Sequence, residues 1–459
     1  MKYPAVITAL LAASVHAWMP AERDLAAFNQ TSDSLTTRAP SLPSYKIRGV
    51  NLGGWLISEP WMMGDEWKLM GCGGQCSEFD CVKALGQTKA DSAFDAHYAR
   101  WITPDMVTLM YNAGLNTIRI PIGYWSLHSL VTSGEYFPNV NLKYLDAVIQ
   151  RAAELGMFVV IDLHGAPGAQ KVGDAFTGQV SLSPTALFSH LDSNNPPQCL
   201  PQSGLPAFYT QQNYDRATKW LTWMTKRIHT TPSYAATIGI IQVVNQPQTN
   251  RDSGGMPQAE KDTLTQIYYP SALRAVRTAE NDLGIASNSR LHVQFMDTLW
   301  GAGSPSSSLP TSSDPFIMYD DHNYVGGAVT ATHPNAKQAD YMYYTCNLDN
   351  RLSDNDVPKL VGEWSLTVSA EYSAEFDWKI EANVPFYKQW FVAQQRLYER
   401  TNGWIFWSWR TQLNDPRWDY SYLVYKGWVP TTAAGLEASS KQDVCKSYFG
   451  TRRRVKRWE

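Results

Sequence analysis

The sequence carries little net charge and has no hydrophobic run long enough to cross a membrane. Its 39 Lys and Arg nearly balance 42 Asp and Glu, which leaves a net charge of -3 over 459 residues. Such a chain has no general electrostatic attraction to nucleic acid or to an anionic membrane. No run beyond the N-terminus approaches the roughly 20 apolar residues of a membrane helix. We therefore expect no nucleic-acid partner and no membrane insertion.

Signatures of metal and nucleotide cofactors are also missing. The chain contains no HExxH motif, no His or Cys pair of finger-like spacing near the clustered Cys72, Cys76 and Cys81 that would complete a zinc site, and no GxGxxG after its first candidate strand. His164 and His322 are the two histidines considered as metal ligands, and neither belongs to a metal-binding motif. We expect no cofactor and no metal.

The N-terminus has the features of a secretory signal peptide. Lys2 supplies the positive start, Val6 to Val15 is mostly apolar, and Ala17 is a small residue for cleavage before Trp18. This predicts a signal peptide over residues 1–17 and a secreted protein, extracellular or in a cell wall. Six cysteines in a secreted chain indicate disulfides. Their connectivity stays open, with Cys72 and Cys81 as the favoured pair.

The remaining chain divides by composition. Residues 18–44 are rich in Ser, Thr, Ala and Pro and predict a loosely ordered leader, which includes a glycosylation sequon at Asn29. Residues 45–440 alternate short apolar runs with helical patterns, which is typical of parallel βα units. Residues 441–459 end in a basic run over 452–457, which we interpret as a solvated terminus rather than a wall anchor.

The alternating region predicts an α/β fold, a single (β/α)8 barrel with extended loops at the C-terminal ends of its strands. A doubly wound open sheet is the alternative. Thr103-Pro104-Asp105 is a good helix start, with Thr as the cap. The stretch Gly165 to Tyr209 shows no clear element and predicts a long loop beside the site. The eight strand candidates are Lys46–Leu52, Thr117–Pro121, Phe158–Leu163, Ile238–Val244, Leu291–Met296, Ile317–Tyr319, Leu360–Gly362 and Trp404–Trp407.

Polar and aromatic side chains gather at the ends of these candidate strands. In such barrels the reactive groups come from the C-terminal strand ends. The chain also has 18 Trp and 24 Tyr, and flat aromatic rings stack on the apolar faces of sugars. The strand ends carry Arg119, His164, Asn245, Gln246, His322, Tyr324, Glu363, Trp407 and Trp409.

Several segments resemble the fungal β-glucanases of glycoside hydrolase family 5. They include Arg48-Gly49-Val50-Asn51-Leu52-Gly53-Gly54-Trp55, Ile118-Arg119-Ile120-Pro121, Asp162-Leu163-His164-Gly165 and Val361-Gly362-Glu363-Trp364. Met70-Gly71-Cys72 to Ser77-Glu78-Phe79-Asp80-Cys81, with Trp404-Ile405-Phe406-Trp407-Ser408-Trp409, most resembles the endo-β-1,6-glucanase branch. The exo-β-1,3-glucanases are near cousins. The resemblance covers roughly residues 45 to 435.

The resemblance implies a retaining mechanism, in which one carboxylate attacks the anomeric carbon and a second carboxyl group about 5 Å away transfers protons. Glu363 matches the nucleophile, and Arg119 would hold it ionised through charge and hydrogen bonding. His322 and Tyr324 match the hydrogen-bonding pair beside that carboxylate.

The same resemblance assigns substrate contacts. His164 and Asn245 match residues that fix the sugar, with Asn245 reaching its 2-hydroxyl. Trp407 would form the floor of the sugar site, with Trp409 as the alternative.

One position departs from the family pattern. The family reads Asn-Glu-Pro after the fourth strand, whereas this chain reads Asn245-Gln246-Pro247. Glutamine has nearly the shape of glutamate but cannot exchange a proton at ordinary pH. General acid–base help contributes a factor of about 10² to 10⁴. The nearest downstream acid in the sequence is Asp252.

Three interpretations of Gln246 remain open, so whether the chain is an enzyme is also open. The first is a pseudoenzyme that binds β-glucan polysaccharide or oligosaccharide, with hydrolysis strongly impaired or lost. The second is an active or weakly active β-1,6- or β-1,3-glucan hydrolase that uses Glu363, with a proton from another group or with activated donors. The third is an introduced or erroneous change in an ordinary hydrolase. A monomer is expected in each case.

Overall fold

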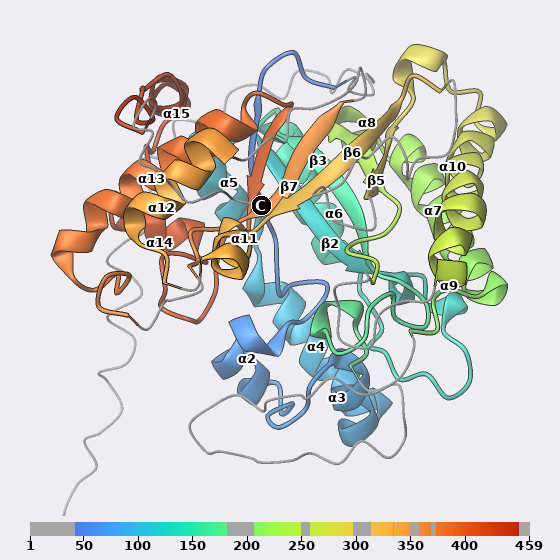
Figure 1. The fold of residues 1–459 in the computed structure, drawn as a ribbon. Helices are drawn as coiled ribbons and strands as arrows, with labels where there is room; N and C mark the ends of the chain where they lie inside the picture. The colour runs from blue at the N-terminus through green and yellow to red at the C-terminus, as the bar shows by residue number, and fades with distance from the viewer. Residues whose placement is uncertain are drawn as a thin grey trace, which may run out of the picture. The chain divides into compact units, whose positions relative to one another are not determined.

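Eight parallel strands form a closed barrel in which β8 pairs back to β1. The strands labelled in Figure 1 lie together at the centre, with α7 and α10 on one side and α13 on the other. The computed structural model describes residues 42–180, 206–248, 258–296, 314–333, 335–348, 358–368 and 373–448. All eight strand predictions are confirmed, and the closed barrel excludes an open sheet. The strands are β1 (Ile47–Asn51), β2 (Thr117–Gly123), β3 (Phe158–Gly165), β4 (Ile238–Gln242), β5 (His292–Met296), β6 (Ile317–Asn323), β7 (Lys359–Trp364) and β8 (Gly403–Phe406).

Helices follow the strands and pack on one another around the barrel, as α7 does on α10 and α5 on α6. The predicted helix start at Thr103 is confirmed, because its hydroxyl accepts from the Met106 amide and Pro104 opens the helix. The α-helices are α2 (Gly64–Leu69), α3 (Glu78–Leu85), α4 (Gln87–Trp101), α5 (Pro104–Asn112), α6 (Lys143–Glu154), α7 (Gln211–Thr230), α8 (Pro232–Thr237), α9 (Gln258–Thr263), α10 (Tyr269–Asp282), α11 (Val325–Thr332), α12 (Gln338–Tyr343), α13 (Val384–Tyr398), α14 (Tyr420–Tyr425) and α15 (Ala433–Ser440).

One face of the barrel strands is apolar near the strand starts and polar near the strand ends. Successive side chains of a strand point to opposite faces, so every second residue lies on the same face. Toward the strand starts, one face carries a separate apolar cluster. Two to four residues further along β3 and β6, the same face carries Asp162, His164, Asp320 and His322. The polar layer therefore lies toward the C-terminal strand ends. The apolar cluster consists of Ile47, Phe158, Val160, Ile240, Met318, Leu360 and Ile405.

Two disulfides are described with both of their cysteines. Cys72 is bonded to Cys81 across a Cα separation of 5.1 Å, which confirms the favoured pair. Cys346 is bonded to Cys445 across 5.6 Å and so holds the segment after α15 against the residues that follow α12. Cys76 is disulfide-bonded as well.

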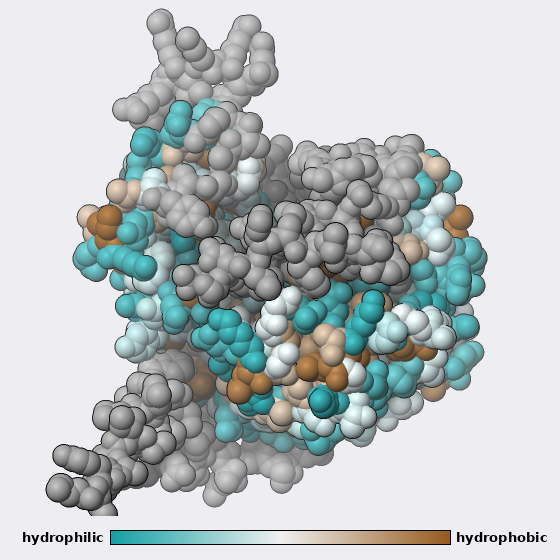
Figure 2. All heavy atoms as spheres, turned by 90° about the horizontal axis from the view of Figure 1, so that it is seen from below, coloured by the Kyte–Doolittle hydropathy of each residue, from teal (hydrophilic) through white to brown (hydrophobic). Residues whose placement is uncertain are grey.

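Several predictions lie outside the described residues and remain predictions. They concern the signal peptide over 1–17, nearly all of the leader over 18–44, and the basic run over 452–457. Among the residues that are described, no helix is both long and apolar enough for a bilayer. The face drawn in Figure 2 shows hydrophobic residues in several small groups separated by hydrophilic ones.

A buried acid at the start of α3 predicts a pH-dependent stability. Glu78 is fully buried and accepts a hydrogen bond from the Ser58 amide at 2.7 Å. Burial raises its pKa from 4.5 to about 8. Between these values the folded chain binds more protons at Glu78 than the unfolded chain does, so folding stability falls as the pH rises.

Glu78→Gln removes this titration, and we expect the variant to gain stability relative to the unaltered chain from pH 5 to pH 8. A proton difference of one corresponds to about 1.4 kcal/mol per pH unit. Denaturant unfolding at both pH values measures the gain. Glu154→Gln is the control, because the pKa of this mostly solvated residue is lowered and its contribution is constant over the window. Parallel stability profiles for Glu78→Gln and the unaltered chain would contradict the prediction.

Candidate active site

Arg119 on β2 links side chains from four other strands at the polar end of the barrel. Its guanidinium is fully buried. Nη1 donates to Asn51 Oδ1 on β1 at 2.8 Å and to Glu363 Oε1 on β7 at 3.0 Å. Nη2 donates to Gln242 Oε1 on β4 at 2.9 Å and pairs with Asp162 Oδ2 on β3 at 2.9 Å. One cation therefore organises the centre of the predicted site.

Glu363 is held by three predicted site residues. Besides Arg119, the hydroxyl of Tyr324 donates to Glu363 Oε2 at 2.8 Å, and His322 Nδ1 lies 3.3 Å from the same oxygen. Burial and the negative charge of Glu363 raise the pKa of Tyr324 well above its ordinary value. Tyr324 thus keeps its proton and acts as the donor. The carboxylate is buried and fixed in orientation, as a nucleophile requires.

Each of the two histidines is bonded to an aspartate two residues before it in the same strand. His164 Nδ1 lies 2.6 Å from Asp162 Oδ2, and His322 Nε2 lies 2.9 Å from Asp320 Oδ2. Residues two apart in a strand share a face, so the Asp-x-His spacing brings each pair together. Neither aspartate was predicted as a site residue, although the Asp-x-His spacing is present in the sequence. Such a pair fixes the orientation of the imidazole ring.

Gln246 occupies the position opposite Glu363. Its side-chain amide lies 2.8 Å from His322 Nδ1. Since Glu363 Oε2 is 3.3 Å from that same nitrogen, the amide and the carboxylate are at most about 6 Å apart, close to the separation of a retaining pair. The backbone of Gln246 has a φ of 38°, in the left-handed region that non-glycine residues rarely adopt. Such strain is concentrated at functional positions.

His322 is the only side chain for which contacts to both Gln246 and Glu363 are described. Burial lowers its pKa, but the negative charges of Glu363 and Asp320 outweigh burial, so the pKa is raised above its ordinary value. An amide matches either protonation state, because it offers N–H to a bare Nδ1 or, after rotation, its oxygen to a protonated one. The Gln246 amide therefore suits His322 in either protonation state.

The sugar-contacting candidates lie beside this centre. Asn245 Oδ1 accepts from Arg119 Nη2 at 3.0 Å, and its Nδ2 lies 3.5 Å from His164 Nε2. The Trp407 ring lies parallel to the His164 imidazole, with centroids 5.6 Å apart. Trp409 does not join them, because its ring stacks on Tyr420 within the main hydrophobic core. Of the two tryptophans, Trp407 is the one beside the site.

Carboxylates outnumber arginines at this centre. Arg119 is within 3.7 Å of three carboxylates, those of Asp162, Asp320 and Glu363. Fixed negative groups in a water-poor site favour positive charge on a bound ligand. An oxocarbenium-like transition state at an anomeric carbon carries such a charge.

Gly362, the residue before Glu363, has no room for a side chain because the Asp320 side chain lies against its Cα. A Cβ on Gly362 would overlap with the carboxylate of Asp320 on the neighbouring strand β6. We expect Gly362→Ala to lower the free energy of unfolding by about 1–3 kcal/mol, as overpacking in a core does. The control is Gly64→Ala, because Gly64 has no atom within 4 Å of the added methyl. Denaturant unfolding measures both, and equal stability of the two variants would contradict the account.

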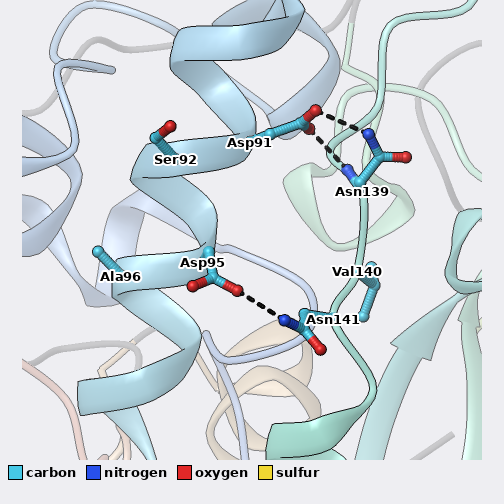
Figure 3. A pocket seen from close by; sticks show the side chains of 7 residues that line it. All are labelled: Asp91, Ser92, Asp95, Ala96, Asn139, Val140 and Asn141. Atoms are coloured by element: carbon cyan, nitrogen blue, oxygen red, sulfur yellow. Dashed lines mark hydrogen bonds between the residues drawn. The ribbon is translucent and has the colours of Figure 1, made fainter.

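A hollow elsewhere on the surface is a poor alternative site. It has a volume of about 620 Å³ and lies between α4 and the segment 139–141 (Figure 3). Asp91 accepts from the backbone and the side chain of Asn139, and Asp95 accepts from Asn141. Its carboxylates are thus already hydrogen-bonded within the protein. Among the described residues, no three His, Cys, Asp or Glu are grouped to hold a metal ion.

The barrel, with a buried carboxylate, an arginine and an aromatic ring at its C-terminal strand ends, defines a carbohydrate-active scaffold. Residues 82–412 match the cellulase model of glycosyl hydrolase family 5. The chain is 40% identical to glucan endo-1,6-beta-glucosidase B of Emericella nidulans over 422 residues, which cover 90% of this chain and 93% of the relative. The protein belongs to glycosyl hydrolase family 5.

More distant proteins agree with this placement. The chain is 26% identical to the probable glucan 1,3-beta-glucosidase A of Aspergillus clavatus over 87% of this chain and 90% of the relative. The crystal structure of rutinosidase from Aspergillus niger has a TM-score of 0.62 at 17% identity and covers 84% of this chain and 98% of that one. The similarity to rutinosidase concerns the fold alone.

Proposed function

We propose that the protein is a secreted β-glucan-recognising protein on a retaining endo-β-1,6-glucanase-like scaffold, with hydrolysis strongly impaired or lost. The observation that carries the proposal is Gln246. Its amide lies against His322, within about 6 Å of Glu363, where a retaining enzyme places its proton-transferring carboxyl group. An amide can hold a glycosidic oxygen but cannot protonate it.

The proposed ligand follows from the relatives and from the intact surroundings of Glu363. The relative that is 40% identical is named for action on β-1,6-glucan, and we extend that linkage to this chain. Trp407, His164 and Asn245 supply an aromatic face and hydrogen-bonding groups of the kind that sugars require. A polysaccharide ligand outside the cell also fits the predicted signal peptide over residues 1–17, so we propose that the protein lies outside the cell or in the wall.

The second candidate is a weak hydrolase that uses Glu363 as its nucleophile. This alternative is favoured by the retained contacts of Glu363 to Arg119 and Tyr324. With a leaving group that departs without protonation, such as a dinitrophenolate, Glu363 could form the glycosyl ester unaided. Aryl glucosides with acidic phenols would then react much faster than β-glucan does.

Binding to immobilised glucan tests the first candidate. We expect the unaltered chain to be retained on insoluble β-1,6-glucan and released by soluble β-1,6-linked oligosaccharides, with weaker retention on β-1,3-glucan. Trp407→Ala should lose retention because it removes the aromatic face, while Tyr425→Ala, an exposed ring on α14, should keep it. Equal retention of the Trp407→Ala variant, or no retention of the unaltered chain, would refute glucan recognition at this site.

A further inference from the structure

The turn that carries Gln246 has an unusual backbone conformation. Gln246 has a φ of 38°, in the left-handed region that non-glycine residues rarely adopt. Such a conformation persists only where the surrounding structure holds it. Since β4 ends at Gln242, the turn lies beyond the strand. The place of the Gln246 side chain therefore depends on the bonds that the main chain makes on either side of it.

Gln170, in the loop after β3, bonds to the main chain on both sides of Gln246. Its side-chain Nε2 donates to the carbonyl of Asn245, the residue before Gln246, at 2.9 Å. Its own carbonyl accepts from the amide of Gln248, two residues after Gln246, at 2.9 Å. Gln170 is fully buried, so both bonds are shielded from water. A single residue thus fixes the two ends of the 245–248 turn.

Gln170 is itself fixed to the end of β3. Its Nε2 also donates to the carbonyl of His164 at 2.6 Å, and its Oε1 accepts from the amide of Ala166 at 3.0 Å. Both N–H groups and the oxygen of the side-chain amide therefore have partners within the protein. Because His164 belongs to a barrel strand, the turn is referred to the rigid wall of the barrel.

Tyr209, two residues before α7, completes the same set of bonds. Its hydroxyl donates to the carbonyl of Gln170 at 3.0 Å and accepts from the amide of Gln248 at 2.8 Å. The side-chain Oε1 of Gln248 accepts from the amide of Val172 at 3.0 Å. The two ends of the loop between β3 and α7 and the 245–248 turn are thus joined by buried hydrogen bonds.

We propose that Gln170 is the positioning residue for position 246, because it holds the 245–248 turn with the side chain at 246 against His322 and within about 6 Å of Glu363. The inference rests on the proposed place of Gln246 beside Glu363 and deepens it. A misplacement of about 1 Å can cost about 10²-fold in rate. A carboxyl group introduced at position 246 therefore transfers protons efficiently only while Gln170 holds the turn.

The alternative is that Gln170 only stabilises the fold. Its loss would then lower stability, and every step at Glu363 would be slowed equally or left unchanged. Two substrates separate these roles. Cleavage of β-1,6-glucan needs a proton from the group at position 246, whereas a dinitrophenolate leaves a glucoside without one. A positioning role affects the first reaction and spares the second.

The kinetic test adds Gln170→Met to the Gln246→Glu variant. Methionine has a similar length but no hydrogen-bond donor. We expect Gln170→Met to lower turnover of β-1,6-glucan by about 10²-fold. The first burst of dinitrophenolate from a dinitrophenyl β-glucoside, which reports the attack by Glu363 alone, should keep its rate. Equal losses in both rates, or no loss in either, would overturn the positioning role.

Gln395→Met is the matched control for this substitution. Gln395 on α13 is also fully buried, and its Nε2 donates to the carbonyl of Leu436 at 2.8 Å. It should leave both rates as they are. Tyr209→Phe is a second variant, which removes one hydroxyl and should slow glucan cleavage selectively but more weakly. Thermal unfolding verifies that each variant is folded, and Tyr209→Phe carries the test if Gln170→Met does not fold.

Histidine NMR tests the same inference without turnover. The Gln246 amide lies 2.8 Å from His322 Nδ1, so the ring signals of His322 report its place. In Gln170→Met they should move toward those of Gln246→Ala, while the signals of His97 on α4 stay unchanged. Unmoved His322 signals would overturn the proposal. If they move but Gln246→Glu gains no turnover, Gln170 does position the turn and the proposed effect of Gln246 on hydrolysis fails instead.

Discussion

Gln246→Glu is expected to raise the rate of β-1,6-glucan hydrolysis by about 10² to 10⁴, the usual contribution of a positioned general acid–base group. The new carboxyl group would replace an amide that already lies 2.8 Å from His322 and within about 6 Å of Glu363, so little rearrangement is needed. His322 would hydrogen-bond to it as it does to the amide. Sugar release from β-1,6-glucan, with β-1,3-glucan in parallel, measures the gain.

A double variant provides the control for this gain. Gln246→Glu combined with Glu363→Gln restores the proton-transferring group but removes the carboxylate proposed to attack the anomeric carbon. It should be as inactive as the unaltered chain. Activity of the double variant would show that Glu363 is not the nucleophile, and no gain in the single variant would show that Gln246 is not what limits turnover.

Arg119→Met is expected to cost about 3–5 kcal/mol of folding stability, the usual effect of removing one partner of a buried ion pair. The substitution keeps much of the side-chain volume but leaves Asp162, Asp320 and Glu363 in a buried site without their cation. It also removes donors to Asn51 and Gln242. Denaturant unfolding at neutral pH measures the loss.

The control for Arg119 is a partly exposed ion pair of the same type. Arg151 pairs with Glu154 at 3.0 Å where both side chains contact solvent, and Arg151→Met should cost less than about 1 kcal/mol. Similar losses for the two variants would mean that Arg119 is not the centre of a buried charge cluster. A loss below about 1 kcal/mol for Arg119→Met would mean the same.

Much of the barrel could be read from the sequence, because each strand is a short apolar run followed by a polar turn. The main error was in length. The sixth strand was predicted to end at Tyr319, whereas β6 continues to Asn323. The continuation was not predicted because the polar residues Asp320 and His322 interrupt the apolar run by which the strand was recognised. Their polarity is explained only by the layer of charges that they meet inside the barrel.

The residues of the site were predicted more fully than the contacts between them. Arg119, Glu363, Tyr324, His322, Asn245 and His164 were all identified and do converge. Which of Trp407 and Trp409 faces the site could not be decided, because that depends on how the chain turns after β8.

The contacts of Asp162 and Asp320 are visible only in the folded protein. Asp162 and Asp320 would look like ordinary strand acids, yet both lie against Arg119 and each orients a histidine. The hydrogen-bonded and charged surroundings of Glu363 are therefore complete, whereas the neighbouring Gln246 cannot transfer a proton. This combination is the physical reason for proposing recognition rather than efficient cleavage.

The most direct test of that proposal follows binding and cleavage together in the unaltered chain. A β-1,6-linked gluco-oligosaccharide is titrated into the protein by calorimetry, and the same mixture is then analysed by mass spectrometry for shortened products. We predict saturable binding with product formation at least about 100-fold slower than with Gln246→Glu. Turnover close to that of Gln246→Glu would contradict the account and would require another group to supply the proton.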